Sequence, residues 1–399
     1  MDLDQLFAFH ENSLKKVPLT RRYLYSRLDW TQRAICLWGA RGVGKTTLLQ
    51  QYFLEKYNDV EKGLYISADN IQVASLGLFS IAEEYFKYGG ELLMIDEVHK
   101  YPNWSQEIKN IIDTYKQKQI FFSGSSAIAL NQGLADLSRR IAAYTLRGLS
   151  FREFLELQHG IHFQPFTLND ILKNHIKIAT KIIRQTNILK SFREYVSWGY
   201  YPFFLESQEL YHQRLLRVIE RVLTEDIPAI SNITPPKILS LKKLLWLIAS
   251  SQPFIPHIEK MSSAIQLSKE YTYHFVEYLE KAGLLHSLFS PAKGYKRIRK
   301  PGKIFLENTN MLEAINGSLK LTGETGTIRE TFFVNQLKEL PIFLGDRADF
   351  IVDKITFEIG GKSKKETQLE KVQDGYLVLD NIEIGNQKRI PLYLFGFLY

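Results

Sequence analysis

The sequence predicts an α/β fold in which a parallel β-sheet carries helices on both faces. Four short, largely apolar runs, at 34–38, 63–67, 91–97 and 119–123, read as strands that are buried on both faces. Patterns typical of helices separate these runs. A glycine-rich turn follows the first run directly and leads into a further helical pattern. This order of elements is typical of an open sheet that binds its ligands at the carboxyl ends of its strands.

The glycine-rich turn has the form G-x-x-x-x-G-K-[ST], which in a strand–loop–helix context is the phosphate-binding loop. Its backbone N–H groups and the helix N-terminus favour phosphate. We expect Lys45 to bridge the β- and γ-phosphates and the Thr46 hydroxyl to bind Mg²⁺. The loop therefore predicts binding of ATP with Mg²⁺. The residues expected to contact the nucleotide are Gly39, Ala40, Arg41, Gly42, Val43, Gly44, Lys45, Thr46 and Thr47.

Two carboxylates end the third run, about fifty residues beyond the loop. Asp96 is placed to hold Mg²⁺ with Thr46, and Glu97 to polarise a water against the γ-phosphate. A glutamate in this place favours hydrolysis over transfer to a bound acceptor. The next strand, which commonly lies between these two in hydrolytic nucleotidases, ends near Ser123 and Ser125. A hydroxyl there senses the γ-phosphate or belongs to an ordinary turn, and both interpretations stay open.

Composition limits the class of protein. The chain has 399 residues and a net charge of +8, a basic bias that permits nucleic-acid contact but equally fits a lysine-rich surface. A single cysteine, Cys36, excludes internal disulfides and suits a reducing compartment. The acidic first residues are unlike a secretory signal, and no apolar run reaches the ~20 residues of a membrane span. We therefore expect a cytoplasmic protein with no membrane partner.

Several segments occur together in this chain. Besides the phosphate loop, they are Met94–Trp104, Phe122–Ser126, Leu149–Phe154 and Ile390–Tyr399. With them the chain resembles, over essentially its whole length, the large prokaryotic family of predicted AAA+ superfamily ATPases (STAND-like, archaeal-type). Members of that family carry a C-terminal domain of unknown function related to restriction-endonuclease-like folds.

With the resemblance, the chain is expected to have five parts. Residues 1–33 are a helical lead-in that breaks at Pro18 and restarts near Thr20, and Arg21, Arg22 or Tyr23 either contacts adenine or packs. The other parts are an AAA+-type ATPase core at 34–150, a helical lid at 151–234, a winged helix at 235–306 and a nuclease-like domain at 307–399.

The family pattern also places a Gly-Arg pair shortly after the strand that ends at Ser123. Ser138-Arg139-Arg140 stands in its place, so the resemblance implies that Arg140 matches the family arginine. A guanidinium that reaches a γ-phosphate, on its own nucleotide or a neighbour's, accelerates hydrolysis. The alternative is a salt-bridged arginine at a helix end.

The winged helix is expected from three helical patterns, the third capped by Ser268 and closed by Gly283, followed by a basic hairpin. The third helix and the basic wing, 293–300, are candidates for contact with double-stranded DNA. The alternative is a module that packs against protein, in this chain or a partner.

The last part shows the residue order of PD-(D/E)XK nucleases, with Glu330 on a helix and Asp349 and Glu358 around two strands. Gly360 stands where these enzymes have a lysine. Lys362, Lys364 or Lys365 would have to supply that group, and Gln368 is expected to begin the next helix. This departure favours a structural domain without nuclease activity.

The function predicted from these features is Mg²⁺-dependent ATP hydrolysis that drives a switch. The nucleotide state would set how the C-terminal domains engage DNA, a protein partner or a second copy. The alternative is a DNA-processing nuclease gated by ATP. A small-molecule phosphotransferase is disfavoured because no acceptor pocket is recognisable.

Overall fold

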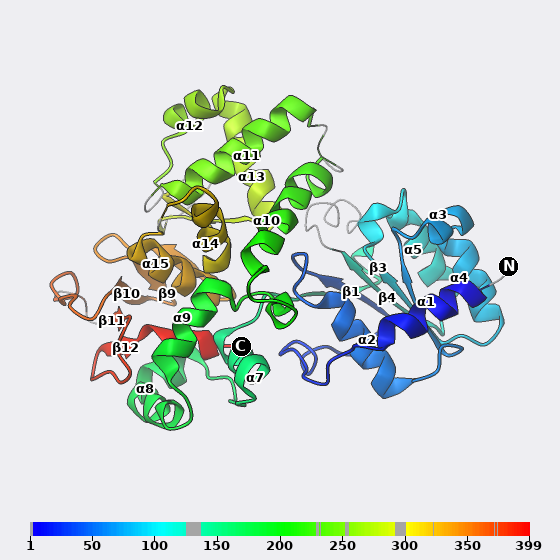
Figure 1. Cartoon of the computed structure of the whole chain (residues 1–399), viewed down its shortest axis with the longest axis horizontal. Coiled ribbons are helices and arrows are strands. Elements are labelled where there is room, and N and C mark those ends of the chain that lie inside the picture. The colour runs from blue at the N-terminus through cyan, green and yellow to red at the C-terminus, as the bar shows by residue number, and fades with distance from the viewer. Residues whose placement is uncertain are drawn as a thin grey trace. The chain divides into compact units, whose positions relative to one another are not determined.

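The computed structural model describes residues 3–124, 137–228, 231, 233–251, 255–291, 301–321, 323–370, 372 and 374–399. The chain divides into two compact units (Figure 1). The first comprises Met1–Gly148 and Glu225–Asn232, and the second comprises Leu149–Thr224 and Ile233–Tyr399. The predicted division into five parts is finer than this and stays a prediction.

The first unit is built on a sheet of five parallel strands in the order β2-β3-β4-β1-β5. Each residue of β3 is buried, as expected for a strand covered on both faces. The strand after the carboxylates, β4, lies between β1 and β3, as predicted. The strands are β1 (Ala34–Trp38), β2 (Gly63–Ser67), β3 (Leu92–Asp96), β4 (Gln119–Gly124) and β5 (Ala142–Thr145).

Helices surround this sheet, and each of them buries apolar side chains (Figure 1). They are α1 (Asp4–Leu14), α2 (Lys45–Lys56), α3 (Ile71–Leu76), α4 (Leu78–Lys87), the short 3₁₀ helix η1 (Val98–Lys100) and α5 (Trp104–Thr114). The second helix predicted before the sheet does not form. Residues from Thr20 to Trp30 make turns instead, because the backbone is held there by hydrogen bonds such as Tyr25 N to Arg22 O at 2.9 Å.

The second unit is mainly helical in its first two thirds. Its helices are α7 (Phe151–His159), α8 (Leu168–Ile183), α9 (Ile188–Trp198), the 3₁₀ helix η2 (Pro202–Leu205), α10 (Tyr211–Arg221), α11 (Pro235–Ser250), α12 (Ile258–Ile265), α13 (Lys269–Lys281), α14 (Thr309–Ser318) and α15 (Thr325–Gln336). A short π-helical turn, η3 (Val222–Asp226), continues α10 into the returning part of the first unit.

Three helices and an antiparallel strand pair, β6 (Leu285–Leu288) and β7 (Lys303–Leu306), occur over the segment predicted as a winged helix. Ser268 caps α13 through the N–H of Tyr271 at 3.3 Å, and Gly283 follows that helix with φ +72°, as expected. The predicted basic wing, 293–300, lies outside the described residues. The winged-helix assignment therefore stays a prediction.

A mixed sheet of five strands in the order β12-β11-β10-β9-β8 forms the last part of the second unit. Pairs among β8, β9 and β10 are antiparallel, and those among β10, β11 and β12 are parallel. Among the residues that the structure describes, no helix is long and apolar enough to span a membrane. The elements are β8 (Ile342–Leu344), β9 (Phe350–Val352), β10 (Ile355–Gly360), β11 (Gly375–Leu379), β12 (Arg389–Pro391) and the 3₁₀ helix η5 (Leu392–Phe397).

Candidate nucleotide site

The predicted phosphate loop joins the end of β1 to the start of α2. Its glycines Gly39, Gly42 and Gly44 have φ angles of +146°, +81° and +98°, which L-residues with a side chain rarely adopt. A Cβ at Gly39 would also lie 2.2 Å from the carbonyl oxygen of Leu146. The loop ends at the N-terminus of the 12-residue α2, where unpaired N–H groups favour an anion.

Lys45, the first residue of α2, is buried and turned back over the loop. Its Nζ donates to the carbonyl oxygens of Gly39 and Ala40 at 2.9 and 3.1 Å. Burial lowers the pKa of Lys45, while the carboxylates of Glu97 and Asp96 counteract this effect. The ammonium group therefore lies among the loop carbonyls, where it can meet a phosphate bound to the loop.

Asp96 is the last residue of β3, and its carboxylate accepts hydrogen bonds from hydroxyl groups of three elements. It accepts hydrogen bonds from Thr46 and Ser123, and from the Tyr65 hydroxyl at 3.0 Å. The sheet thus brings together the two predicted Mg²⁺ ligands, Thr46 and Asp96, from positions fifty residues apart. Hard oxygen donors of this kind fit Mg²⁺, which keeps most of its other sites for water and phosphate oxygens. Sequence reasoning missed Tyr65, because it lies in the middle of β2 and no motif marks it.

Glu97 follows Asp96 in a left-handed conformation, with φ +53°, which directs its side chain away from the strand. Its Oε2 lies 3.7 Å from Arg41 Nη2 and 3.6 Å from His99 Nε2. The same oxygen accepts no hydrogen bond within the described residues. The carboxylate therefore faces the Arg41 guanidinium and the His99 imidazole, and its Oε2 is buried beside them.

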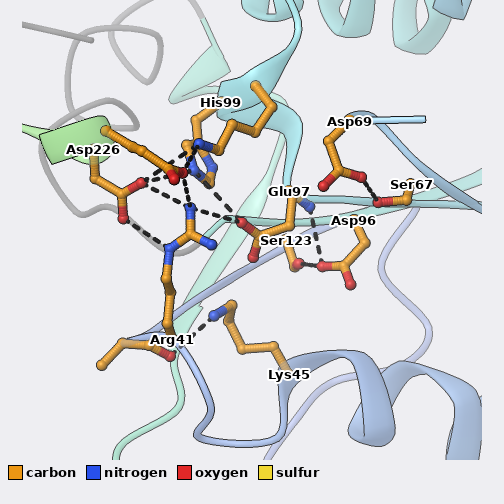
Figure 2. Close-up of polar contacts among 12 residues, drawn as sticks. Arg41, Lys45, Ser67, Asp69, Asp96, Glu97, His99, Ser123 and Asp226 are labelled. Carbon is orange, nitrogen blue, oxygen red and sulfur yellow. Dashed lines mark hydrogen bonds and ion pairs between the residues drawn. The ribbon is translucent and has the colours of Figure 1, made fainter. Parts of the chain in front are cut away.

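An unforeseen carboxylate, Asp226, pairs with the phosphate loop (Figure 2). Arg41 Nε and Nη2 donate to its two oxygens at 3.1 and 2.8 Å, and His99 Nε2 lies 3.7 Å from Oδ1. Burial alone would raise the pKa of Asp226, but His99 and Arg41 hold it well below its usual range. The adjacent Glu225 pairs with Lys100 at 2.7 Å. No motif signals this pairing, because 185 residues separate Arg41 from Asp226.

Arg140 is not brought to the loop within the chain. It precedes β5 and pairs with Asp113, which precedes β4, through Nε–Oδ1 and Nη2–Oδ2 contacts of 2.7 and 3.0 Å. Both residues therefore lie at the amino edge of the parallel strands, opposite the loop. These contacts fit the alternative of a salt-bridged arginine, and a role of Arg140 at a nucleotide, its own or a neighbour's, stays a prediction. Ser125, the other predicted γ-phosphate sensor, lies outside the described residues.

Arg22 hydrogen-bonds to the loop backbone and is therefore not free to contact adenine. Its guanidinium donates to the carbonyl oxygens of Val43, within the loop, and of Arg147 and Gly148 at 2.8 and 2.9 Å. Its neighbour Arg21 pairs with Glu55 at 2.8 Å and is half exposed. Of the two interpretations open for Arg22, the packing role fits these contacts.

In the second unit, the predicted nuclease-like residues also come together. Lys303 Nζ lies 3.0 Å from Glu330 Oε2 and 4.0 Å from Asp349 Oδ1. Asp349 N donates to Glu358 Oε2 at 3.2 Å. Burial raises the pKa of both Glu330 and Glu358. The cluster is therefore one buried carboxylate, Glu358, and two partly buried ones, with an ammonium group among them.

Lys364, four residues after Gly360, supplies an ammonium group in place of the lysine that is missing at position 360. Lys364 Nζ lies 2.6 Å from Glu358 Oε1, and a Cβ at Gly360 would lie 2.5 Å from the Lys364 stem. Lys362 and Lys365 are exposed instead. Gln368 lies against Glu358. The helix expected to begin at Gln368 does not form, because the chain makes a tight turn there in which Leu369 N donates to Glu366 O.

Comparison with known proteins identifies the first unit more closely. Residues 31–155 match a family model described as an AAA domain, and residues 189–322 match one described as a domain of unknown function, DUF8612. The AAA match spans the phosphate loop, Asp96 and Glu97. Together with the five-stranded parallel sheet, it supports a P-loop ATPase of AAA type.

One relative and two solved structures illustrate the range of similarity. The uncharacterized protein MJ1637 of Methanocaldococcus jannaschii is 28% identical over 284 residues, which are 68% of this chain and 59% of that protein. The chain thus spans about three fifths of that relative's length. The Walker-type ATPase PABY2304 of Pyrococcus abyssi aligns with a TM-score of 0.40 and 12% identity, over 79% of this chain and 95% of its own. AMPPCP-bound DnaA from Aquifex aeolicus aligns with a TM-score of 0.28 and 15% identity, over 70% and 88%.

Proposed function

We propose that the chain is a Mg²⁺-dependent ATPase that acts as a nucleotide-driven switch. The observation that carries the proposal is the convergence of four groups at the carboxyl edge of the sheet. The Lys45 ammonium lies over the loop, the Thr46 hydroxyl contacts Asp96, and the next residue, Glu97, has a partly exposed side chain near Arg41 of the loop.

Each group has a separate task in hydrolysis. The loop and Lys45 hold the β- and γ-phosphates, and Thr46 with Asp96 would hold Mg²⁺, which neutralises phosphate charge when bound. Glu97 orients a water molecule and accepts hydrogen bonding from it as its oxygen attacks the γ-phosphorus. The bond from that phosphorus to the bridging oxygen breaks, and ADP and phosphate result. Ser123 keeps Asp96 oriented through its hydrogen bond.

Turnover of ATP by the purified full chain tests this function. Glu97→Gln keeps the size of the side chain and removes its basicity, so turnover should fall by about 100-fold or more while ATP still binds. Lys45→Ala should lose ATP binding. Glu91→Gln, at the opposite end of the same strand and exposed, is the matched control and should behave as wild type. Turnover without added Mg²⁺, or full turnover in Glu97→Gln, would contradict the assignment.

The output of the switch is proposed to be engagement of DNA or a protein partner by the second unit. Its support is the predicted winged helix over 235–306 and the basic net charge of the chain. Turnover measured with and without duplex DNA separates the two partners. Stimulation by DNA that declines with added salt would favour nucleic acid, and no response would favour protein.

An ATP-gated nuclease is the alternative, and the contact of Lys364 with Glu358 is the observation in its favour. Two findings count against it. The Lys303 ammonium lies between Glu330 and Asp349, where a cation would be held. Among the described residues, no group of three or more acidic, histidine or cysteine side chains is suited to hold a metal ion. Plasmid DNA that stays intact with Mg²⁺ or Mn²⁺ and ATP would exclude it; cleavage lost in Asp349→Ala would establish it.

A further inference from the structure

The segment Glu225–Asn232 belongs to the first unit, although the residues before and after it belong to the second. Buried side chains of this segment pack it into the first unit. The Asp226 side chain is 1% exposed, Ile227 is fully buried, and Ser231 is buried as well. A residue that is both charged and this deeply buried requires a strong partner. That partner is Arg41, from the phosphate loop itself.

Arg41 is the cation on which several carboxylates converge. Besides its two hydrogen bonds with Asp226, its Nη2 lies 3.7 Å from both Glu97 and Glu225. Asp226 is also close enough to the loop to counteract, with other carboxylates, the lowered pKa of Lys45. The segment therefore places negative charge beside the loop that receives the phosphates.

A γ-phosphate must lie near the same guanidinium. Glu97 serves a water within about 3 Å, and that water must approach the γ-phosphorus to about 3–3.5 Å. A phosphoryl group in that position lies within reach of Arg41, which is already 3.7 Å from Glu97. The planar guanidinium binds carboxylate and phosphate in the same forked geometry. Asp226 and the γ-phosphate consequently compete for the Arg41 guanidinium. ADP has no γ-phosphate and does not compete with Asp226.

We propose that Asp226 makes the site discriminate ATP from ADP: the γ-phosphate draws Arg41 from Asp226 and loosens the packing of residues 225–228 on the first unit. The inference rests on the proposed function, because it requires a nucleotide in the loop. Since coupling between two sites is reciprocal, the docked segment weakens ATP relative to ADP by the same factor that ATP weakens docking. The chain, which enters the first unit at Glu225 and returns to the second at Ile233, would thereby report the nucleotide state.

Binding of ADP and of the non-hydrolysable analogue AMPPNP to the full chain, measured by calorimetry with Mg²⁺, tests the proposal. Asp226→Asn should raise the preference for AMPPNP over ADP by about 5- to 100-fold, the usual range of such couplings. Asp113→Asn breaks a similar forked Arg–Asp pair at the other edge of the sheet and should leave that preference unchanged. In an Arg41→Ala background, Asp226→Asn should change nothing.

A second measurement needs no substitution at Asp226. Amide hydrogen exchange of the peptide over 222–232 in the wild-type chain should be faster with AMPPNP than with ADP, and this difference should vanish in Arg41→Ala. Equal AMPPNP-to-ADP preference in wild type and Asp226→Asn, or equal exchange with both nucleotides, would overturn the role of Asp226. If the wild-type chain binds neither nucleotide, the ATPase proposal itself fails.

Discussion

The hydrogen bonds of Arg22 to the phosphate loop predict how much stability its removal costs, and the neighbouring Arg21 serves as a control. Arg22→Ala removes a buried guanidinium that donates to three backbone carbonyls, one of them in the loop. Each hydrogen bond from a charged donor contributes about 1.5–3 kcal/mol, and the losses are not additive. We expect the first unit to lose about 3–5 kcal/mol of unfolding free energy, as is typical for breaking a buried charged network.

Arg21→Ala removes an ion pair in which both side chains are about half exposed, 48% and 51%. Exposed pairs contribute about 0.2–1 kcal/mol. Urea unfolding followed by hydrogen exchange of β1 and β4 reports on the first unit specifically. With a slope near 2 kcal/mol per molar urea, the midpoint should fall by about 1.5–2.5 M for Arg22→Ala and by less than about 0.5 M for Arg21→Ala. Equal midpoints for the two variants would show that water satisfies these carbonyls and that Arg22 is no brace.

Three further predictions concern the second unit and the edge of the first sheet. Gly360→Ala places a methyl group against the Lys364 stem and should cost about 1–3 kcal/mol, whereas Gly317→Ala, in a helix with open space around it, should be neutral or stabilising in the same denaturation assay. Burial raises the pKa of Glu330, so the folded chain binds this proton more tightly than the unfolded chain. The free energy of unfolding therefore falls as the pH rises from the ordinary pKa of glutamate through the raised one. Glu330→Gln should gain stability relative to wild type over that pH window, and a stability difference that does not change with pH would contradict this. Arg140→Ala should leave turnover per chain unchanged at dilutions where the chain is monomeric by light scattering, and a loss that persists on dilution would refute its placement away from its own nucleotide.

The catalytic part of the site could be predicted because its information is local. The spacing from Gly39 to Thr46 dictates the loop, since only that arrangement of glycines allows the backbone to turn into the helix. Asp96 and Glu97 could be placed because the apolar run before them has to be a buried strand. Parallel strands then bring their carboxyl ends to one edge, which predicts the contact of Thr46 with Asp96.

Other features depended on contacts that a linear pattern does not contain. A role for Arg140 at the nucleotide was expected only from the family resemblance, whereas its position before the parallel strand β5 places it at the amino edge of the sheet. Lys364 replaces the absent lysine only because the chain curls back over Gly360 after β10. Asp226 lies within the segment predicted as a helical lid, and only tertiary packing shows its pairing with Arg41.

The interrupted course of the first unit has a consequence for how such a domain can be inherited. A recombination event that transferred residues 31–155 alone would carry the phosphate loop and both carboxylates at the end of β3, and would leave Asp226 behind. Arg41 would then have Glu97 as its nearest carboxylate, at 3.7 Å, and would compete with the attacking water for it. Lineages that exchange this domain should therefore keep position 226 acidic where position 41 is arginine, and lose the two together.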